Sequence, residues 1–285
     1  MTHIAILLTC YNRAVKTDVC LRSLMQGLSV NNECSYHIYL VDDNSTDGTA
    51  ALIKNKYPNV NIIQGTGFLF WAGGMRLAWE TALNSKEEYD GFLLINDDVE
   101  FIDSFWDKIH FTRQWCKTHF NKEGIYVLSV KDREKEEISY GGHLFRKRLF
   151  KHSTVLIKPT EQPQLCELAN SNILYVSSEV VKNIGLFDAH FTHFIADFDY
   201  TLCASKKGIP VVICPDFGGY CTNDHTNYWL TLNTLHKRIN YLYSVKGMAL
   251  NEYLYYLRKH FWWKALYLFV VLWIETLFPF LKRNT

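Results

Sequence analysis

Two clusters of acidic residues each follow a short apolar run of the kind that forms a buried strand. The pair Asp42-Asp43 ends one such run, and the triplet Asn96-Asp97-Asp98 ends another. In an open α/β sheet, ligands bind in the crevice at the carboxyl ends of the strands. Carboxylates at that edge can hold a divalent cation and, through it, a diphosphate. The two clusters therefore predict an enzyme that handles a nucleotide-linked substrate.

Apolar runs that alternate with helical periodicity surround these clusters. Branched apolar residues dominate the runs that we expect to be strands, and apolar residues recur every three or four positions between them. Strands that alternate with helices indicate βαβ units and a mainly parallel sheet. The expected strands span residues 4–8, 37–41, 61–63, 91–95, 125–130, 173–176 and 211–213, and the expected helices span residues 19–28, 46–56, 73–83, 178–183 and 199–207.

The composition is that of a globular protein with a large core. The chain has 285 residues, of which 48% are hydrophobic, so it can form one large domain or two small ones. Its 30 basic and 29 acidic residues nearly balance, which argues against a dedicated nucleic-acid binder. The eight cysteines include no C-x-x-C pair and the first residues lack the pattern of a signal peptide, so we expect a reducing, cytoplasmic setting.

The C-terminal segment, residues 227–285, has a helical, aromatic and basic character. Within it, residues 260–281 are the most apolar part of the chain, but Lys264 and Glu275 interrupt them. At about 100° per residue these two charges lie on nearly the same helix face. A narrow polar stripe on a Trp-rich helix favours a helix that lies in the membrane interface. The alternatives are packing on the domain or on a second subunit, as in a homo-oligomer, and a membrane span, which needs about 20 apolar residues.

Five segments, in order along the chain, resemble the family 2 glycosyltransferases. Residues 9–13, Thr-Cys-Tyr-Asn-Arg, and residues 41–48, Val-Asp-Asp-Asn-Ser-Thr-Asp-Gly, resemble the N-terminal signature of that family. Residues 96–98 resemble its D-x-D-like metal motif, residues 176–188 the segment before its acceptor site, and residues 197–203 its E-D-x-D-L element. The resemblance implies the GT-A fold, a mixed and mainly parallel α/β sheet flanked by helices, with a nucleotide-sugar donor and inversion at the anomeric carbon.

The resemblance also implies how the chain is organised and what it does. Residues 1–226 would form the GT-A catalytic domain, with the nucleotide sugar held by about residues 1–100 and the acceptor by about residues 101–226. Residues 227–285 would be a helical extension that associates with a membrane. We expect an inverting, metal-dependent transfer of a sugar from dTDP-rhamnose or a UDP-sugar to a hydroxyl of a cell-surface glycan or lipid-linked saccharide. Such a step belongs to polysaccharide biosynthesis, as of capsule or lipopolysaccharide, at the inner face of the cytoplasmic membrane.

A divalent cation, Mg²⁺ or Mn²⁺, is implied by the same resemblance. As a Lewis acid it would neutralise the diphosphate that leaves. Asp98 and His225 would be its protein ligands, and Asp97 would contribute either a further ligand or a contact to the ribose. Asn96 departs from a strict D-x-D motif, which indicates binding through one carboxylate.

The donor site implied by the family lies mainly in the first hundred residues. Gly73-Gly74 would open a helix whose amino end faces the diphosphate, and Arg76 would pair with a phosphate. Trp71 would form part of the sugar wall, in a glycine-rich stretch similar to that of rhamnosyl- and galactofuranosyltransferase-like members. The complete set of expected nucleotide-sugar contacts is Thr9, Tyr11, Asn12, Arg13, Asp42, Asp43, Trp71, Gly73, Gly74, Arg76 and Asp97.

An inverting transfer also needs a general base for the acceptor hydroxyl. By resemblance that base is Asp197, with Ala196 in place of the glutamate that usually precedes it. Asp199 would touch the acceptor or orient the base, and it could equally cap the helix that follows.

Two other classes of protein stay open as alternatives. A nucleotidyltransferase on a related α/β scaffold would carry a glycine-rich loop near its N-terminus, and residues 9–13 contain no glycine. A catalytically inactive scaffold or glycan-binding protein would tend to lose its site carboxylates, whereas this chain has Asp98, Asp197 and His225.

Overall fold

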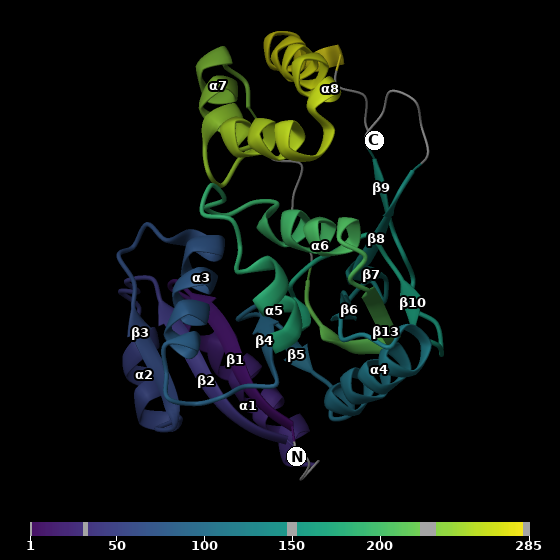
Figure 1. The fold of residues 1–285 in the computed structure, drawn as a ribbon. Helices are drawn as coiled ribbons and strands as arrows, with labels where there is room; N and C mark the ends of the chain where they lie inside the picture. Colours follow the sequence, from purple (N-terminus) through teal and green to yellow (C-terminus); the bar gives the residue numbers. More distant parts are fainter. Residues whose placement is uncertain (1, 31–33, 147–152, 223–231, 282–285) are drawn as a thin grey trace.

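A computed structural model of the chain describes residues 2–30, 34–146, 153–222 and 232–281. Its centre is a ten-stranded mixed sheet with helices on both faces (Figure 1). The amino-terminal half of this sheet is parallel, which confirms the expected βαβ pattern. Its strands, in spatial order, are β4 (Gly91–Ile95), β1 (Thr2–Cys10), β2 (Cys34–Asp42) and β3 (Val60–Gln64).

The side chains of β1 alternate between two hydrophobic cores, one on each face of the sheet. Ala5 and Leu7 belong to one core, whereas Ile4, Ile6 and Leu8 belong to the other. This period of two buries both faces, as is usual for parallel sheets. The first core also takes residues from α3 (Phe70–Leu83), α5 (Ser178–Ile184) and α6 (Ala196–Lys206), and the second from α1 (Ala14–Ser29), α2 (Thr49–Lys56) and α4 (Phe105–Phe120).

The second half of the sheet makes it mixed. β12 pairs antiparallel with both β4 and β6, and β13 runs parallel to β6. A three-stranded sheet in the order β11-β8-β9 lies next to β6 (Figure 1). The bounds are Glu100–Phe101 (β5), Ile125–Lys131 (β6), Ile138–Tyr140 (β7), Gly142–Phe145 (β8), Thr154–Leu156 (β9), Gln164–Leu165 (β10), Leu168–Ala169 (β11), Ile173–Ser177 (β12) and Val211–Tyr220 (β13).

Four helices begin at residues other than those predicted, and α1 starts five residues earlier, at Ala14. α2 starts three residues later, at Thr49, because the carboxylate of Asp47 accepts a hydrogen bond from the Thr49 amide at 3.0 Å and Gly48 adopts a φ of 85°. α3 and α6 each start three residues earlier, at Phe70 and Ala196. The earlier starts place the first turns of α3 and α6 beside the acidic clusters.

The C-terminal extension forms two helices, α7 (Leu235–Tyr243) and α8 (Leu250–Leu277), and a 3₁₀ turn at Pro279–Leu281. They stand beyond α6 at the top of Figure 1. Phe261 interrupts α8 with a φ of −150° and a ψ of 50°. Across the described residues, no helix combines the length and the apolarity that a membrane span requires.

A buried carboxylate attaches α8 to α6. Asp199 accepts hydrogen bonds from Lys259 Nζ at 2.8 Å and from His260 Nε2 at 2.7 Å. Lys259 also donates to Asp188 at 2.9 Å. Although burial disfavours the charge of Lys259, hydrogen bonds to the two carboxylates hold its pKa above the usual range. In the structure the carboxylate of Asp199 therefore has its partners on α8, and the contact to the acceptor or the orientation of the base that we expect of it stays a prediction.

The same cluster contains the ligand atoms of a possible metal site. One atom each of Asp199, Cys203 and His260 lie within 4.8 Å of one another. However, Lys206 Nζ donates to His260 Nδ1 at 3.0 Å, so the ring presents Nε2–H to Asp199 and keeps no lone pair for a cation. The ammonium groups of Lys206 and Lys259, which contact His260 and Asp199, would also repel a divalent ion. The cluster is therefore an ion-pair network that joins two helices.

We expect Asp199→Asn to lower the free energy of unfolding by about 1–3 kcal/mol, because the amide NH2 group cannot accept one of the two hydrogen bonds that Lys259 and His260 donate to the carboxylate. The matched control is Glu100→Gln, which removes the exposed Arg133–Glu100 pair and should cost at most about 1 kcal/mol. Urea unfolding of both variants measures the difference. Equal, small losses in the two variants would contradict the anchoring role of Asp199.

Candidate active site

A cavity of about 800 Å³ lies at the carboxyl ends of β1 and β4. Its walls come from the loop after β1, the start of α3, the acidic turn after β4, and loops of the second half of the sheet. The acidic clusters thus mark the edge at which the structure forms its cavity. The expected site residues that line it are Thr9, Tyr11, Arg13, Asp43, Trp71, Asp97, Asp98 and Asp197.

Arg13 holds the two carboxylates of the second acidic cluster. Its Nη1 donates to Asp97 Oδ1 at 3.1 Å and to Asp98 Oδ2 at 2.7 Å. Asp97 is 5% exposed, and this burial raises the pKa of its carboxyl group to about 7, against the opposing effect of the Arg13 charge. Two adjacent carboxylates next to a cavity supply the oxygen ligands that Mg²⁺ and Mn²⁺ prefer. This donor set therefore fits the expected divalent cation.

A contact between Asn96 and Trp71 explains why the motif begins with an amide instead of an acid. Its Oδ1 accepts a hydrogen bond from Trp71 Nε1 at 2.9 Å, and the Trp71 ring lies 5.5 Å from that of Phe187. The first position of the motif thus fixes the indole that forms part of the cavity wall. An aspartate could accept the same bond, but it would add a third charge to the cluster.

The first acidic cluster organises two loops. Asp43 is buried and accepts hydrogen bonds from the amides of Gly67, Leu69 and Phe70 at 2.7–3.0 Å, which shapes the loop before α3. Asp42 is 1% exposed, and its Oδ1 accepts a bond from the Ser45 amide at 2.9 Å. Asp43 reaches the cavity and Asp42 does not line it, so the structure separates two residues for which we predicted one role.

The loop after β1 carries the remaining predicted donor contacts. Tyr11 is 48% exposed in the cavity wall, and Lys246 lies 5.9 Å from its ring. Thr9 donates to the carbonyl of Val41 at 3.2 Å. Asn12 lies outside the cavity wall and accepts a bond from the Thr46 amide at 2.7 Å, so it ties this loop to the one after β2.

The backbone amides in the first turn of α3 donate hydrogen bonds to other groups of the protein. Those of Ala72 and Gly73 donate to the carbonyl of Thr192 at 2.9 and 3.3 Å. A Cβ at Gly74 would come within 2.3 Å of Thr9 Oγ1, so this glycine lets α3 pack against β1. Neither glycine lines the cavity. The structure thus gives Gly74 a role in packing, and the diphosphate contact that we predicted for the two glycines stays a prediction.

Arg76 likewise lies outside the cavity wall. Its Nη1 donates to the carbonyl of Phe191 at 2.7 Å and to that of Asp188 at 3.2 Å. The guanidinium therefore holds the loop that leads into α6, and the phosphate contact predicted for Arg76 stays a prediction. That loop supplies one wall of the cavity through residues 193–195.

Asp197 lies in the first turn of α6 and faces the cavity. Its Oδ1 accepts a hydrogen bond from the Phe198 amide at 2.8 Å, and its Oδ2 one from the Ser171 amide at 3.2 Å. Burial raises the pKa of Asp197 to about 6, and the hydrogen bonds limit this rise. A carboxylate with a pKa near 6 is ionised at neutral pH and is a stronger base than an ordinary aspartate.

Several cavity residues were not among those predicted. His143 Nε2 lies 2.9 Å from Asn170 Oδ1, and burial lowers the pKa of this imidazole. His193 and Phe198 also line the cavity. The polar run Asn-Ser-Asn at 170–172, directly before a buried strand, was the available signal, because β12 runs antiparallel to β4 and its amino end lies at the same edge as the second acidic cluster. His225, the second predicted metal ligand, lies outside the described residues.

Residues 5–111 match the model of the family described as glycosyl transferase family 2. This range contains the loop after β1, both acidic clusters and α3. No curated protein sequence matches the chain.

Solved structures resemble this chain at low sequence identity. A mannosyltransferase from Pyrobaculum calidifontis, PcManGT, solved with GDP-Man and Mn²⁺, has a TM-score of 0.55 and 11% identity over 87% of this chain. Residues 1–349 of S. aureus TarS give a TM-score of 0.50 and 14% identity over 91%. GalNAc-T7, solved with UDP, GalNAc and Mn²⁺, gives 0.55 and 11% over 85%.

The length of the chain differs from that of these structures. It spans 65% of the mannosyltransferase, 74% of the TarS fragment and 50% of GalNAc-T7. At such identities the likeness concerns the fold. The resemblance seen in the motifs is confirmed: residues 5–111 match the family 2 glycosyltransferases, and the chain has the GT-A fold.

Proposed function

We propose that this chain is an inverting, metal-dependent glycosyltransferase that uses a nucleotide-sugar donor. The observation that carries the proposal is that three carboxylates line one cavity. Asp97 and Asp98 come from the turn after β4, and Asp197 comes from the first turn of α6. The first pair suits a cation and a diphosphate, and the third carboxylate suits an acceptor hydroxyl. Donor contacts then fall mainly within residues 1–100 and acceptor contacts within residues 101–226.

Asp98, with Asp97, would hold the Mg²⁺ or Mn²⁺ ion, which stabilises the charge on the diphosphate as it leaves. In the structure these carboxylates share the Arg13 guanidinium. A bound cation would replace that contact, so Arg13 becomes available to a phosphate oxygen at the same edge of the cavity. Asp43 keeps the loop at residues 67–70 in place beside the donor.

Asp197 would accept the proton of the acceptor hydroxyl. As that proton leaves, the acceptor oxygen bonds to the anomeric carbon from the face opposite the diphosphate, and the bond from carbon to the diphosphate oxygen breaks. The configuration at carbon is inverted. The amides of Ser171 and Phe198 orient the carboxylate for this transfer.

The donor we propose is dTDP-rhamnose or a UDP-sugar, and the acceptor a hydroxyl of a cell-surface glycan or lipid-linked saccharide. The motif resemblance supports this choice, and the similar structures carry GDP-Man in one case and UDP in another. The first experiment should therefore identify the nucleotide base of the donor.

The test is thermal stabilisation by a panel of UDP-, dTDP- and GDP-sugars, with and without Mn²⁺. A ligand at 100 times its Kd stabilises the native state by about 2.7 kcal/mol. We expect a Mn²⁺-dependent rise in Tm for one nucleotide, which Asp98→Asn abolishes and the exposed control Asp103→Asn retains. No shift with any nucleotide would overturn the proposal in favour of an inactive glycan-binding protein.

For Asp197→Asn we expect normal donor binding and a loss of turnover of about 10²–10⁴-fold, since the variant cannot take the proton. In the native enzyme the base acts only when ionised. Because burial raises its pKa to about 6, kcat/KM should be constant above this pH and fall tenfold per unit below it. A pH profile measured on the unmodified protein checks this. Turnover of the variant at the native rate would exclude Asp197 as the base.

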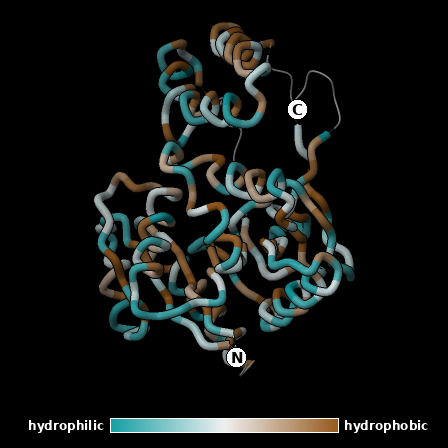
Figure 2. The backbone as a smooth tube through the Cα atoms, in the orientation of Figure 1, coloured by the Kyte–Doolittle hydropathy of each residue, from teal (hydrophilic) through white to brown (hydrophobic). Residues whose placement is uncertain are grey.

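We further propose that α8 docks on the inner face of the cytoplasmic membrane. Among residues 262–281, the described part of the chain after the break at Phe261, the exposed side chains are all apolar, and Lys264 and Glu275 are only half-exposed. Hydrophobic residues predominate along the end of this helix in Figure 2. The exposed residues are Trp262, Trp263, Leu266, Tyr267, Val270, Ile274, Leu277, Phe278, Phe280 and Leu281.

Replacing Trp262 and Trp263 together by Glu should reduce binding to vesicles that contain an anionic phospholipid by at least tenfold, because each buried large side chain contributes about 1.5–3 kcal/mol. Phe111→Glu, at a 46% exposed position on α4, is the control and should bind as the native protein does. Co-sedimentation gives the bound fraction. No binding by the native protein, with dimers in sedimentation velocity, would show that a second copy covers this face.

A further inference from the structure

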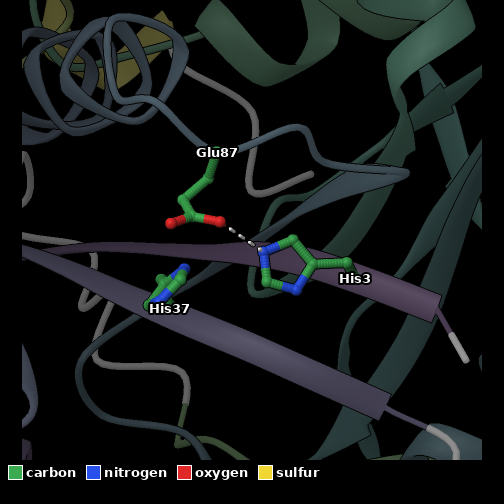
Figure 3. Close-up of side chains that lie close together, drawn as sticks. All are labelled: His3, His37 and Glu87. Carbon is green, nitrogen blue, oxygen red and sulfur yellow. Dashed lines mark ion pairs between the residues drawn. The ribbon is translucent and has the colours of Figure 1, made fainter.

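Two histidines and a glutamate converge at the amino end of the sheet, the end opposite to the cavity. His3 lies on β1 and His37 on the neighbouring β2, two residues further along in the parallel register, where Ala5 is opposite His37. Glu87 lies between α3 and β4. Figure 3 shows the carboxylate of Glu87 directed at the ring of His3, with the His37 ring beside them.

One ligand atom from each of the three side chains lies within 4.8 Å of the other two. His3 Nε2 lies 3.7 Å from Glu87 Oε2. In a tetrahedral Zn²⁺ site with bonds of about 2.0–2.2 Å, neighbouring ligand atoms lie about 3.3 Å apart. Because Glu87 is exposed, its side chain can close the remaining gap by rotation. The backbone needs no rearrangement.

A hydroxyl group lies next to Nδ1 of each imidazole and can accept a hydrogen bond from the proton that Nδ1 carries in the metal-binding tautomer. His3 Nδ1 lies 2.7 Å from Ser35 Oγ, and His37 Nδ1 lies 3.1 Å from the hydroxyl of Tyr89. With the ring proton on Nδ1, each histidine presents an unprotonated Nε2, which is how second-shell partners orient metal-binding histidines. The Tyr89 ring also stacks on that of His3 at 4.9 Å and limits its rotation.

A second observation, independent of the spacing of the three side chains, also indicates a bound ligand, and it concerns the Nε2 atom of His3. It is a buried atom with no hydrogen-bond partner in the described part of the chain. The carboxylate at 3.7 Å is too far to accept a hydrogen bond. Buried polar atoms normally have a partner, and a cation between His3 and Glu87 would provide one here.

We propose that His3, His37 and Glu87 bind a divalent transition-metal ion of the Zn²⁺ class, with the fourth position open to water. Two nitrogen ligands and one carboxylate suit Zn²⁺ and exclude a site built for Mg²⁺, which prefers oxygen. The ion would join β1, β2 and the segment before β4, and so stabilise the amino end of the sheet. This site does not depend on the proposed transferase reaction.

The experiment uses the untagged, full-length chain after treatment with a chelator. Asp98→Asn is included as background, so that the cavity contributes no cation site. We expect Zn²⁺ to raise Tm, Co²⁺ to give visible absorption bands of tetrahedral strength, and excess Mg²⁺ to displace neither ion. In the same background, His37→Gln and Glu87→Gln should each weaken Zn²⁺ binding at least tenfold.

The control is His119→Gln, an exposed histidine on α4, which should leave Zn²⁺ binding unchanged. Glu87 is exposed, so Glu87→Gln is expected to fold, and its Tm without metal should equal that of the parent. The proposal is overturned if Zn²⁺ causes no shift in the parent, or if the Glu87 and His119 variants bind it equally well.

Discussion

The constraint on which the site depends is the burial of carboxylates. A carboxylate removed from water is costly unless donors surround it, so each buried aspartate requires a specific set of amides or cations. In this chain the donors to Asp43, Asp97 and Asp199 come from segments distant in sequence, and these hydrogen bonds fix the loops at the carboxyl edge of the sheet. The aspartates concerned, all at or near that edge, are Asp42, Asp43, Asp97, Asp197 and Asp199.

The result is a cavity whose wall is held by hydrogen bonds within the protein. Asp43 gathers three amides of the loop at residues 67–70, and Arg13 keeps the charges of Asp97 and Asp98 together. Donors that are already oriented cost no reorganisation when charge develops on a substrate. The same argument applies to Asp197, since two backbone amides hold its carboxylate and still leave it a raised pKa.

Local patterns predicted the parallel strands and the edge where chemistry would occur, because apolar runs and the acids that end them are adjacent in sequence. They could not predict the partner of Arg76, which is a carbonyl 115 residues away, or the contact that requires glycine at position 74, which is with Thr9. They also assigned Asp199 to the acceptor. A family motif predicts which residue type occupies a position, but it does not predict the partner of that residue. The partner of Asp199, His260, lies in a helix outside the motif.

Asp197 and Asp199 share the first turn of α6, and this proximity relates the C-terminal helix to the cavity. Asp199 is fixed by Lys259 and His260, and the helix breaks at the next residue, Phe261. The apolar face that we propose to dock on a membrane begins directly after that break. An orientation imposed on the docked half of α8 would therefore act through this ion-pair network, which includes Asp199, on the turn that carries the proposed base. Had α8 been tied to the domain only by apolar packing, it could slide without moving α6, because apolar contacts are non-directional, whereas a buried hydrogen-bonded charge pair permits one geometry.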